Sequence, residues 1–440
     1  MLELMHEKIL PEEIKKQEKR RVHMEKRAIS EKMLEALRCF LNGEKVMWED
    51  GLSGEDWQML FRLCQHHQIL PMIYDTVYAC PAFQTCPQET VQMIKTQVIR
   101  QVMVQSRKTE EFLQLYKKLL DQDLTPLVVK GLVCRELYRE PDYRCSGDED
   151  VLIPAEQFKT CGEVFAAAGM DMLEPDQNPD EAGEVPFYKV GGLLHIELHK
   201  ELFSSESEAY GALNRLFEGV FARKIQETIH GVPVYTMCHT DHLLYLILHA
   251  FKHFLHSGFG IRQVCDIVIY AEAYGGEIDW DELMEKCKGI HADVFAASLF
   301  DIGKKELTFD PVKACYPESW SSVEVDGSDL LEDLLEGGVF GDSSMSRKHS
   351  SNITLQAVSE DKKGKKAGAS LMQTLFPDRK YMERTYTYLK KYPFLLPAAW
   401  ASRMLNYLKE SKSMGGNDAM ESIEIGNHRV DLMKKYKIIQ

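Results

Sequence analysis

The stretch Ser146-Gly147-Asp148-Glu149-Asp150-Val151-Leu152-Ile153 decides the fold of this chain. Its apolar second half predicts a short buried strand at residues 148–153. Because side chains in a strand alternate between two faces, Asp148 and Asp150 point the same way and Glu149 points to the other face. Two neighbouring carboxylates are unfavourable unless they are solvated, share a proton or bind a cation, and Mg²⁺ prefers carboxylate oxygen. The stretch predicts a pair of metal ligands, with an acidic surface turn as the alternative interpretation.

A second strand carries a third acid. In His195-Ile196-Glu197-Leu198-His199, alternation places His195, Glu197 and His199 on one face and the apolar residues on the other. We expect this strand to form a hairpin with residues 186–190, because the pair Gly191-Gly192 separates them. Glu197 is therefore expected to converge on the aspartate pair.

The residues upstream of the first strand favour an anion site. A short apolar strand at residues 127–129 is followed by Lys130-Gly131, which we expect to lead directly into a helix. Free N–H groups at such a strand-to-helix junction attract anions, and Arg135 and Arg144 add positive charge nearby in the sequence. The segment thus combines acids that suit a metal with a site that suits phosphate.

These elements define a three-part organisation. Helical periodicity dominates before residue 118, where Ser53 and Asp56 form a short version of a capping box ahead of a helix that starts near Trp57. Strands and helices interleave at 119–235, and helices return at 236–440. We predict an α+β fold with a small mixed-sheet core between N- and C-terminal helical lobes. The polar stretch at residues 343–370 is expected to be a mobile loop.

Composition narrows the class of protein. The chain has 440 residues and a formal net charge of −15, which disfavours binding to an extended nucleic acid. No apolar run reaches the roughly 20 residues that a membrane-spanning helix needs. The charged residues 1–21 do not resemble a secretory signal, and the eleven scattered cysteines lack a CxxC pair. We expect a cytoplasmic protein without a disulfide framework.

The motifs together resemble a known family. Lys130-Gly131, Leu137-Tyr138, Arg144, the Asp148-x-Asp150 pair with its apolar continuation, and Ile196-Glu197-Leu198-His199 are similar to the nucleotidyltransferase superfamily of DNA polymerase beta type. More narrowly, they resemble a family of uncharacterised bacterial nucleotidyltransferases. Weaker similarity extends over about residues 30–410.

The resemblance implies a reaction and its catalytic residues. A nucleoside monophosphate would pass from a nucleoside triphosphate (NTP) to a hydroxyl acceptor, a small molecule or a protein. Asp148, Asp150 and Glu197 would be the catalytic residues and would hold Mg²⁺, with two ions expected. Glu197 would also act as the base for the acceptor hydroxyl.

The resemblance also implies a set of nucleotide-binding residues. Lys130, Gly131 and Arg144 would position the phosphates. His249, His253 and His256 fall on one face of a predicted helix, a spacing that also suits Zn²⁺, but no nearby acid completes such a site. We therefore expect Lys252 and His253 to face the cleft and contact nucleotide or acceptor.

Two departures from the superfamily pattern support an alternative function. Leu132 stands where a hydroxyl or glycine usually follows the glycine of the turn, and Glu149 stands where an apolar residue usually separates the two acids. The alternative is a catalytically degenerate nucleotidyltransferase-like module that binds or scaffolds. Metal-dependent nucleotide binding and turnover distinguish the two.

Overall fold

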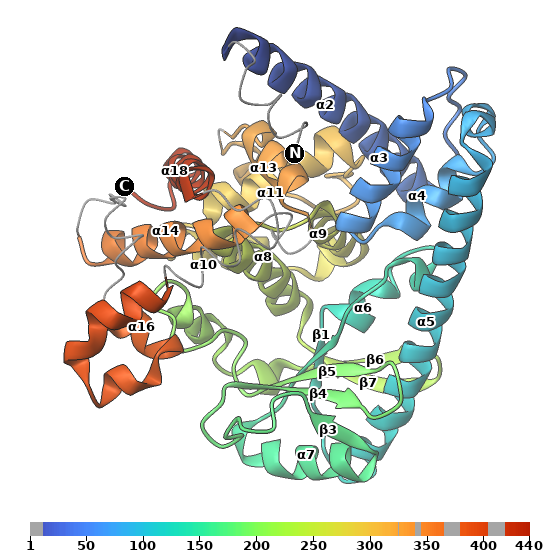
Figure 1. Ribbon diagram of the computed structural model, residues 1–440. Coiled ribbons are helices and arrows are strands. Elements are labelled where there is room, and N and C mark those ends of the chain that lie inside the picture. Colours follow the sequence, from blue (N-terminus) through green and yellow to red (C-terminus); the bar gives the residue numbers. More distant parts are fainter. Residues whose placement is uncertain (1–11, 324, 339–344, 365–378, 404–418) are drawn as a thin grey trace. The chain divides into compact units, whose positions relative to one another are not determined.

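The computed structural model describes residues 12–323, 325–338, 345–364, 379–403 and 419–440 (Figure 1). Contacts divide the chain into two compact units. The first contains the chain up to Ser106, Tyr138–Cys145 and Glu306–Thr308, and the second contains all remaining residues. Helix α5 (Gln88–Leu120) belongs to both, because the division falls within it. The sheet and the C-terminal helices, which the sequence assigned to different parts, therefore share one unit.

The first unit is helical over its described residues. It contains α2 (Glu12–Asn42), α3 (Gly54–His66), α4 (Leu70–Val77), the short η1 (Pro81–Thr85) and η2 (Pro141–Tyr143), and the first part of α5. Its core is aromatic: the fully buried Trp57 contacts the rings of Trp48, Phe61 and Phe83. The predicted capping box is confirmed, because the Ser53 hydroxyl accepts from the Asp56 N–H and the Asp56 carboxylate accepts from the Ser53 N–H.

A five-stranded mixed sheet forms the centre of the second unit. The strands are β1 (Leu127–Val129), β2 (Glu149–Leu152), β3 (Met170–Met172), β4 (Glu184–Lys189) and β5 (His195–His199), in the order β1-β2-β5-β4-β3. Only β2 and β5 pair in parallel. The predicted hairpin of β4 and β5 is confirmed. A separate hairpin joins β6 (Ile225–Ile229) and β7 (Val232–Thr236).

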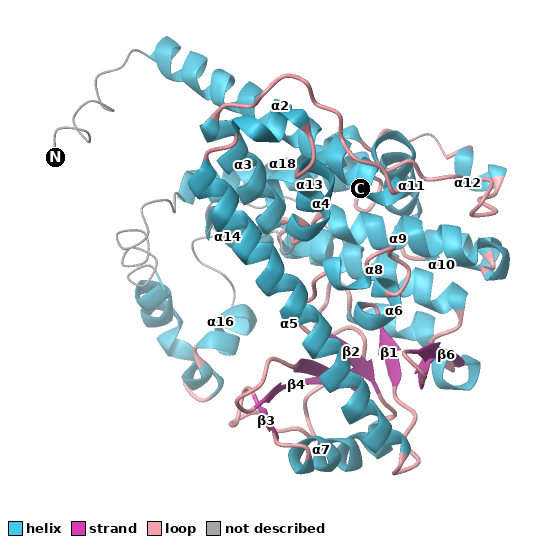
Figure 2. Ribbon diagram, turned by 90° about the vertical axis from the view of Figure 1, so that its right-hand side faces the viewer, coloured by secondary structure: helices cyan, strands magenta, loops and turns pink. Residues whose placement is uncertain are grey.

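The two faces of this sheet differ in chemistry. On one face, Val151, Ile196 and Leu198 are buried, and Phe187 packs edge to face against Phe165 of α7 (Phe158–Ala167) with 5.2 Å between ring centroids. On the opposite face the register pairs Asp150 with Glu197. Figures 1 and 2 show α7 on one side of the sheet and α8 (His239–His256) on the other. The hydrophobic effect thus fixes which face remains for polar chemistry.

Helices make up the rest of the second unit. Helix α6 (Gly131–Arg135) directly follows Lys130, as expected, and is short. Helix α8 is buried over most of its surface. The remaining helices and short helical turns are α9 (Ile261–Tyr274), α10 (Trp280–Lys288), α11 (Asp293–Glu306), α12 (Glu318–Ser321), α13 (Ser328–Gly337), α14 (Met345–Lys362), α16 (Arg379–Thr385), α18 (Ala419–Lys435), η3 (Ala155–Gln157), η4 (Gly211–Phe217), η5 (Val220–Arg223), η6 (Gly275–Glu277), η7 (Thr387–Lys390) and η8 (Pro393–Leu395).

The predicted mobile loop at residues 343–370 is wrong over most of its length. Residues 345–362 form helix α14, which packs along α18 and α8, while 343, 344 and 365–370 lie outside the described residues. One face of α14 is built from small hydroxyl residues: Ser346, Ser350 and Thr354 are buried. The Thr354 hydroxyl donates to the carbonyl of Leu255 at 2.7 Å. Among the described side chains of this helix, buried apolar residues (Ile353, Ala357 and Val358) begin only at residue 353, so the segment reads as polar although it is a packed helix.

Two expectations from composition can be compared with the described structure. All eleven cysteines are free, in agreement with the absence of a disulfide framework. Among the helices that the structure describes, none has both the length and the apolar character that crossing a membrane requires.

Candidate active site

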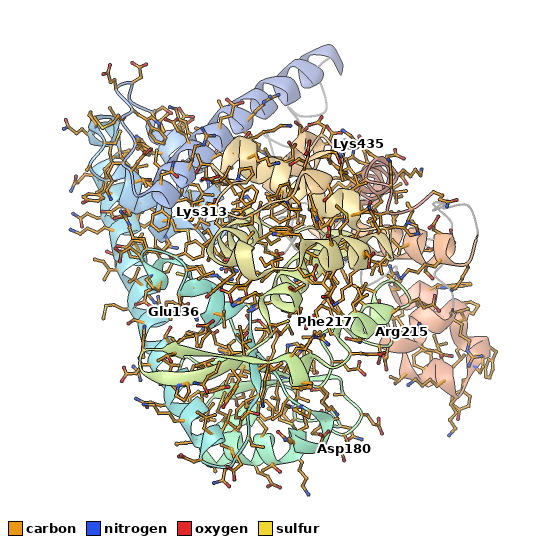
Figure 3. The ribbon with its side chains drawn as sticks, turned by 180° about the vertical axis from the view of Figure 1, so that it is seen from behind. Glu136, Asp180, Arg215, Phe217, Lys313 and Lys435 are labelled. Atoms are coloured by element: carbon orange, nitrogen blue, oxygen red, sulfur yellow. The ribbon has the colours of Figure 1, made fainter. Side chains whose placement is uncertain are left out.

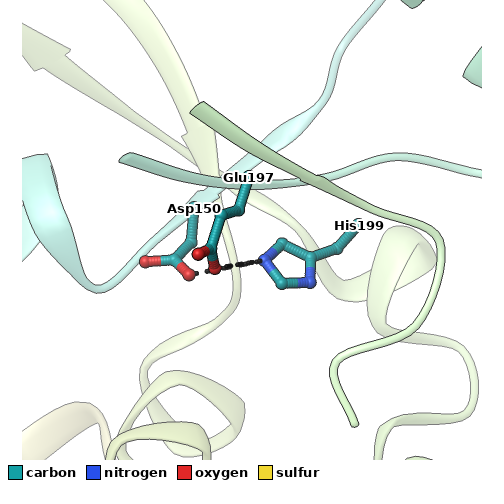
Figure 4. A group of neighbouring side chains, drawn as sticks. All are labelled: Asp150, Glu197 and His199. Carbon is teal, nitrogen blue, oxygen red and sulfur yellow. Dashed lines mark ion pairs between the residues drawn. The ribbon is translucent and has the colours of Figure 1, made fainter. Parts of the chain in front are cut away.

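The parallel pairing of β2 with β5 brings the predicted acids together. Asp150 lies directly opposite Glu197 in the register, and His199 follows two residues later on the same face. Figure 4 shows the three side chains pointing toward one another. His199 Nε2 lies 3.4 Å from Asp150 Oδ1 and 3.6 Å from Glu197 Oε2, and its Nδ1 lies 3.5 Å from Glu184 Oε2. The sheet register alone therefore creates an acidic group centred on one imidazole.

This group fits a divalent cation. One ligand atom each from Asp150, Glu197 and His199 lies within 4.8 Å of the others, which makes them a possible metal-binding group. Asp150 and His199 are buried, yet neither ring nitrogen of His199 makes a hydrogen bond. Buried polar atoms without hydrogen bonds are costly unless a ligand or ion satisfies them. Carboxylate oxygens and imidazole nitrogen are ordinary ligands for divalent metals.

The charges in this group perturb one another strongly. Burial alone would lower the pKa of His199, but the adjacent Asp150 and Glu197 carboxylates outweigh it and raise the pKa to about 10. Burial alone would raise the pKa of Asp150, but Lys130 and His199 hold it well below its usual value. Without a metal, the site is thus a network of charged groups that neutralise one another.

Asp148 occupies a different position from its predicted partner. It precedes β2 and is partly exposed, and it is not a member of the three-residue group. Burial would lower the pKa of Lys130, but Asp150 and then Asp148 act against it, so that the pKa is raised. Asp148 therefore acts electrostatically on the Lys130 end of the site, and its role as a metal ligand stays a prediction.

Lys130 is a direct neighbour of the acids. Its Nζ lies 2.7 Å from Asp150 Oδ2 and 3.3 Å from His249 Nε2 on α8. Only 17% of its side chain is exposed. The predicted nucleotide-binding lysine thus lies at the site, where it contacts a carboxylate.

Gly131 has a packing role that the sequence did not reveal. A Cβ at this position would lie 2.2 Å from the Glu149 carboxylate, so only glycine allows this approach. Glu149 points away from Asp150 and forms a fully buried ion pair with Arg135, and it also accepts a hydrogen bond from Ser146. Glu149, which stands where the superfamily usually has an apolar residue, therefore does not disrupt β2. The predicted contact of Gly131 with phosphate stays a prediction.

Helix α8 supplies the polar groups on the opposite side of the site. The rings of Tyr245, His249 and His253 follow one another along it, with centroid separations of 5.7 and 4.5 Å. Burial, reinforced by Lys252 and Lys130, lowers the pKa of His253 to about 3, so this imidazole is neutral. Lys252 and His253 are partly exposed, as residues that contact a ligand must be.

Arg144 is the one predicted site residue outside the second unit. It is buried within the first unit, and its predicted contact with phosphate stays a prediction. Conversely, the sequence assigned no individual role to His199 or His242, and it considered His249 only together with His253 and His256 on one helix face. The alternation of β5 placed His199 on the face of Glu197, and His242 precedes His249 by seven residues, so both signals were present.

Comparison with known proteins identifies the chain at the family level. A sequence model of the family described as "Uncharacterised nucleotidyltransferase" matches residues 53–302. The chain belongs to this family. The matched region of this nucleotidyltransferase family contains β1, β2, β5 and α8, the elements that build the site.

Comparisons with curated proteins and with solved structures add no support to the family assignment. No curated protein matches the chain. Among solved structures, an antigenic nucleotidyltransferase-like protein from Paracoccidioides brasiliensis aligns with a TM-score of 0.31 at 13% sequence identity, covering 47% of this chain and 95% of that protein.

Proposed function

We propose that the protein is a metal-dependent nucleotidyltransferase of DNA polymerase beta type, which transfers a nucleoside monophosphate from an NTP to a hydroxyl acceptor. The observation that carries this proposal is the register of β2 and β5, which sets Asp150 beside Glu197. Lys130 links Asp150 to the polar stripe of α8, which consists of His249, Lys252 and His253. The family assignment supports the same reaction class. A cytoplasmic location also remains our proposal from the sequence.

The acids are proposed to hold Mg²⁺. Asp150, Glu197 and Asp148 would provide carboxylate oxygens, and two ions are expected from the family resemblance. A bound divalent cation neutralises phosphate charge, including the charge that develops as the α-phosphorus is attacked. His199 faces the carboxylates of Asp150, Glu197 and Glu184 at 3.4–3.6 Å without forming a hydrogen bond, and this arrangement supports occupancy of the position by a cation.

The remaining residues are proposed to bind and orient the substrates. Lys130, Lys252 and His253 would contact the phosphates or the base, with Gly131 and Arg144 as further phosphate contacts. The acceptor oxygen forms a bond to the α-phosphorus, the bond from that phosphorus to the bridging oxygen breaks, and pyrophosphate leaves. The acceptor proton passes to the carboxylate of Glu197, which is one-third exposed and so accessible to an acceptor.

The test combines binding with turnover. A thermal-shift panel of ATP, CTP, GTP and UTP, with and without Mg²⁺, identifies the donor, since ligand at 100 times Kd stabilises a protein by about 2.7 kcal/mol. Transfer from that NTP, radiolabelled at the α-phosphate, is then followed into candidate acceptors.

Asp150→Asn should reduce transfer by about a hundredfold or more, because a charge contact made in the transition state is lost. The matched control is Asp171→Asn on β3, an exposed aspartate of the same sheet, which should transfer as wild type does. If Asp150→Asn transfers nucleotide as fast as the control, the catalytic assignment is wrong.

A catalytically degenerate module is the second candidate. The Glu149 carboxylate fills the space beside Gly131 where the superfamily usually has no acid, and Leu132 supplies no hydroxyl for a phosphate at this turn. Nucleotide binding without turnover, or binding that does not depend on Mg²⁺, would favour this candidate.

A further inference from the structure

Lys130 has a backbone conformation that a lysine rarely adopts. Its φ is +62° and its ψ is −104°, a strained combination for any residue with a Cβ. Glycine would adopt a positive φ without this strain, and the next residue is a glycine. A lysine at such a position indicates that its side chain has a function there.

A buried histidine holds this turn in place. The N–H of Lys130 donates to His242 Nε2 at 3.0 Å. His242 Nδ1 lies 3.2 Å from the Thr236 hydroxyl, which itself donates to the carbonyl of Val128 at 2.7 Å. The hydroxyl proton is used on Val128, so Nδ1–H is the donor to Thr236 and Nε2 is the acceptor for Lys130. Helix α8 therefore fixes the direction in which the Lys130 side chain leaves the backbone.

The Lys130 ammonium takes a place that a metal ion needs. It lies 2.7 Å from Asp150 Oδ2, while Asp150 Oδ1 faces His199 at 3.4 Å. Both oxygens of the central metal ligand are thus already engaged by side chains. A divalent cation and an ammonium cannot contact the same buried carboxylate oxygen without strong repulsion.

His249 offers the ammonium a second contact. Its Nε2 is 3.3 Å from Lys130 Nζ, on the side of the site where α8 also carries Lys252 and His253. The flexible lysine stem can move the ammonium away from Asp150 by side-chain rotation alone, while His242 keeps the backbone fixed.

We propose that Lys130 is an exchangeable cation: it pairs with Asp150 when no divalent ion is bound, and the ion displaces it toward α8, where it binds phosphate. This inference rests on the proposed function, which supplies the nucleotide phosphate that the displaced Lys130 binds. If Lys130 is exchanged in this way, the metal ion binds first and the nucleotide second, and the Lys130 side chain couples the two events. The empty site is neutralised by the lysine, and the loaded site presents that same lysine to the donor nucleotide.

The first test follows the accessibility of the Lys130 amine. The 440-residue protein is treated briefly with an amine-acylating reagent, and labelling is read by mass spectrometry without metal and with MgCl₂. Mg²⁺ should raise the labelling rate of Lys130 by about tenfold, which corresponds to roughly 1.4 kcal/mol of lost pairing. Lys313, labelled in Figure 3, has a side chain that is 62% exposed and serves as the internal reference. An unchanged Lys130 rate overturns the exchange.

The second test uses variants and Mn²⁺ as the probe, counting free Mn²⁺ by electron paramagnetic resonance. Lys130→Met should bind Mn²⁺ about tenfold more tightly than wild type, because no ammonium competes for Asp150. Lys252→Met is the matched control, since it removes the same charge from the same side of the site without a contact to Asp150. Equal tightening in both variants would mean that only general electrostatics operate, and the exchange would be wrong.

The outcomes separate the exchange from the proposed function. Metal-dependent exposure of Lys130 in a protein that transfers no nucleotide supports the exchange and removes the enzymatic assignment. If the protein transfers nucleotide but the labelling rate of Lys130 does not change with Mg²⁺, the proposed function is supported and the exchange is wrong. Mn²⁺ binding to Lys130→Met but not to wild type would show a permanent block, which also contradicts exchange.

Discussion

At the scale of single residues, Glu149 can pack against Gly131 only because glycine has no Cβ. The Glu149 carboxylate lies where a Cβ would project from Gly131, and Arg135 neutralises it without any exposure to solvent. A buried ion pair that loses its geometry leaves uncompensated charge in a low-dielectric interior. The stability of strand β2, which carries Asp150, therefore depends on this glycine.

Gly131→Ala should destabilise the protein by about 1–3 kcal/mol, the usual range for overpacking a filled interior. Urea denaturation followed by circular dichroism measures this change. Gly147→Ala is the matched control, because a Cβ there meets no atom within 4 Å and the loss should be small. Adding Glu149→Asp to Gly131→Ala should restore part of the stability, since the shorter side chain withdraws the carboxylate. Equal stability of the two alanine variants would contradict this account.

Individual site residues were predictable to the extent that they followed strand alternation. Asp150 and Glu197 were placed on one face from their sequence positions, and the register confirms that they are neighbours. The sequence could not show that Glu149 pairs with Arg135, because fourteen positions and a loop separate them along the chain. Nor could it show that His242 binds the backbone of Lys130, a contact between residues 112 positions apart.

At the scale of elements, α8 is held at its C-terminus by helices from the far end of the chain. A helix leaves its last four carbonyls without intrahelical partners. Here Arg429 of α18 donates to the carbonyls of Phe254 and His256, and Arg347 of α14 donates to that of Ser257 at 2.7 Å. Asp333 of α13 is buried between the two arginines. Three helices thus stabilise the end of the helix that carries His249, Lys252 and His253.

Arg429→Met should therefore cost about 3–5 kcal/mol of unfolding free energy, the range for breaking a buried charge pair. It should also weaken Mg²⁺-dependent nucleotide binding, because the polar stripe of α8 loses its fixed position. Urea denaturation and the thermal-shift panel measure the two effects. Arg27→Met on α2 removes an exposed arginine from a surface pair with Glu31 and should change stability by less than about 0.5 kcal/mol. A loss in Arg429→Met no larger than in this control would show that the caps on α8 are dispensable.

The elements differ in how well the sequence revealed them. The capping box of α3 and the hairpin of β4 and β5 follow from local chemistry, and both are confirmed. Helix α14 was missed because much of its buried face consists of Ser346, Ser350 and Thr354 instead of an apolar stripe. The Ser350 and Thr354 hydroxyls donate to carbonyls, and the Ser346 hydroxyl donates to the Glu421 carboxylate. Tertiary partners decide such an element, and a single sequence does not display them.

At the scale of the whole molecule, the candidate metal ligands all belong to one compact unit. Asp150, Glu197 and His199, together with Lys130 and the α8 stripe, lie in the second unit, while α2, α3 and α4 lie in the first. The family match begins at residue 53 in the first unit and ends at residue 302 in the second. Helices α13, α14 and α18 follow that match, so the caps on α8 come from sequence outside it.

This division predicts where a metal ion stabilises the chain. A ligand that binds only the native state lowers the population of openings that disrupt its site, and it leaves unrelated openings unchanged. Hydrogen exchange measured by mass spectrometry should therefore slow in β2, β5 and α8 when Mg²⁺ is added, with little change in α3 and α4. Asp150→Asn should abolish the effect and Asp171→Asn should retain it. Equal slowing throughout α3 and α4 would instead mean that the two units open as one cooperative structure, since only then does binding in the second unit suppress exchange in the first.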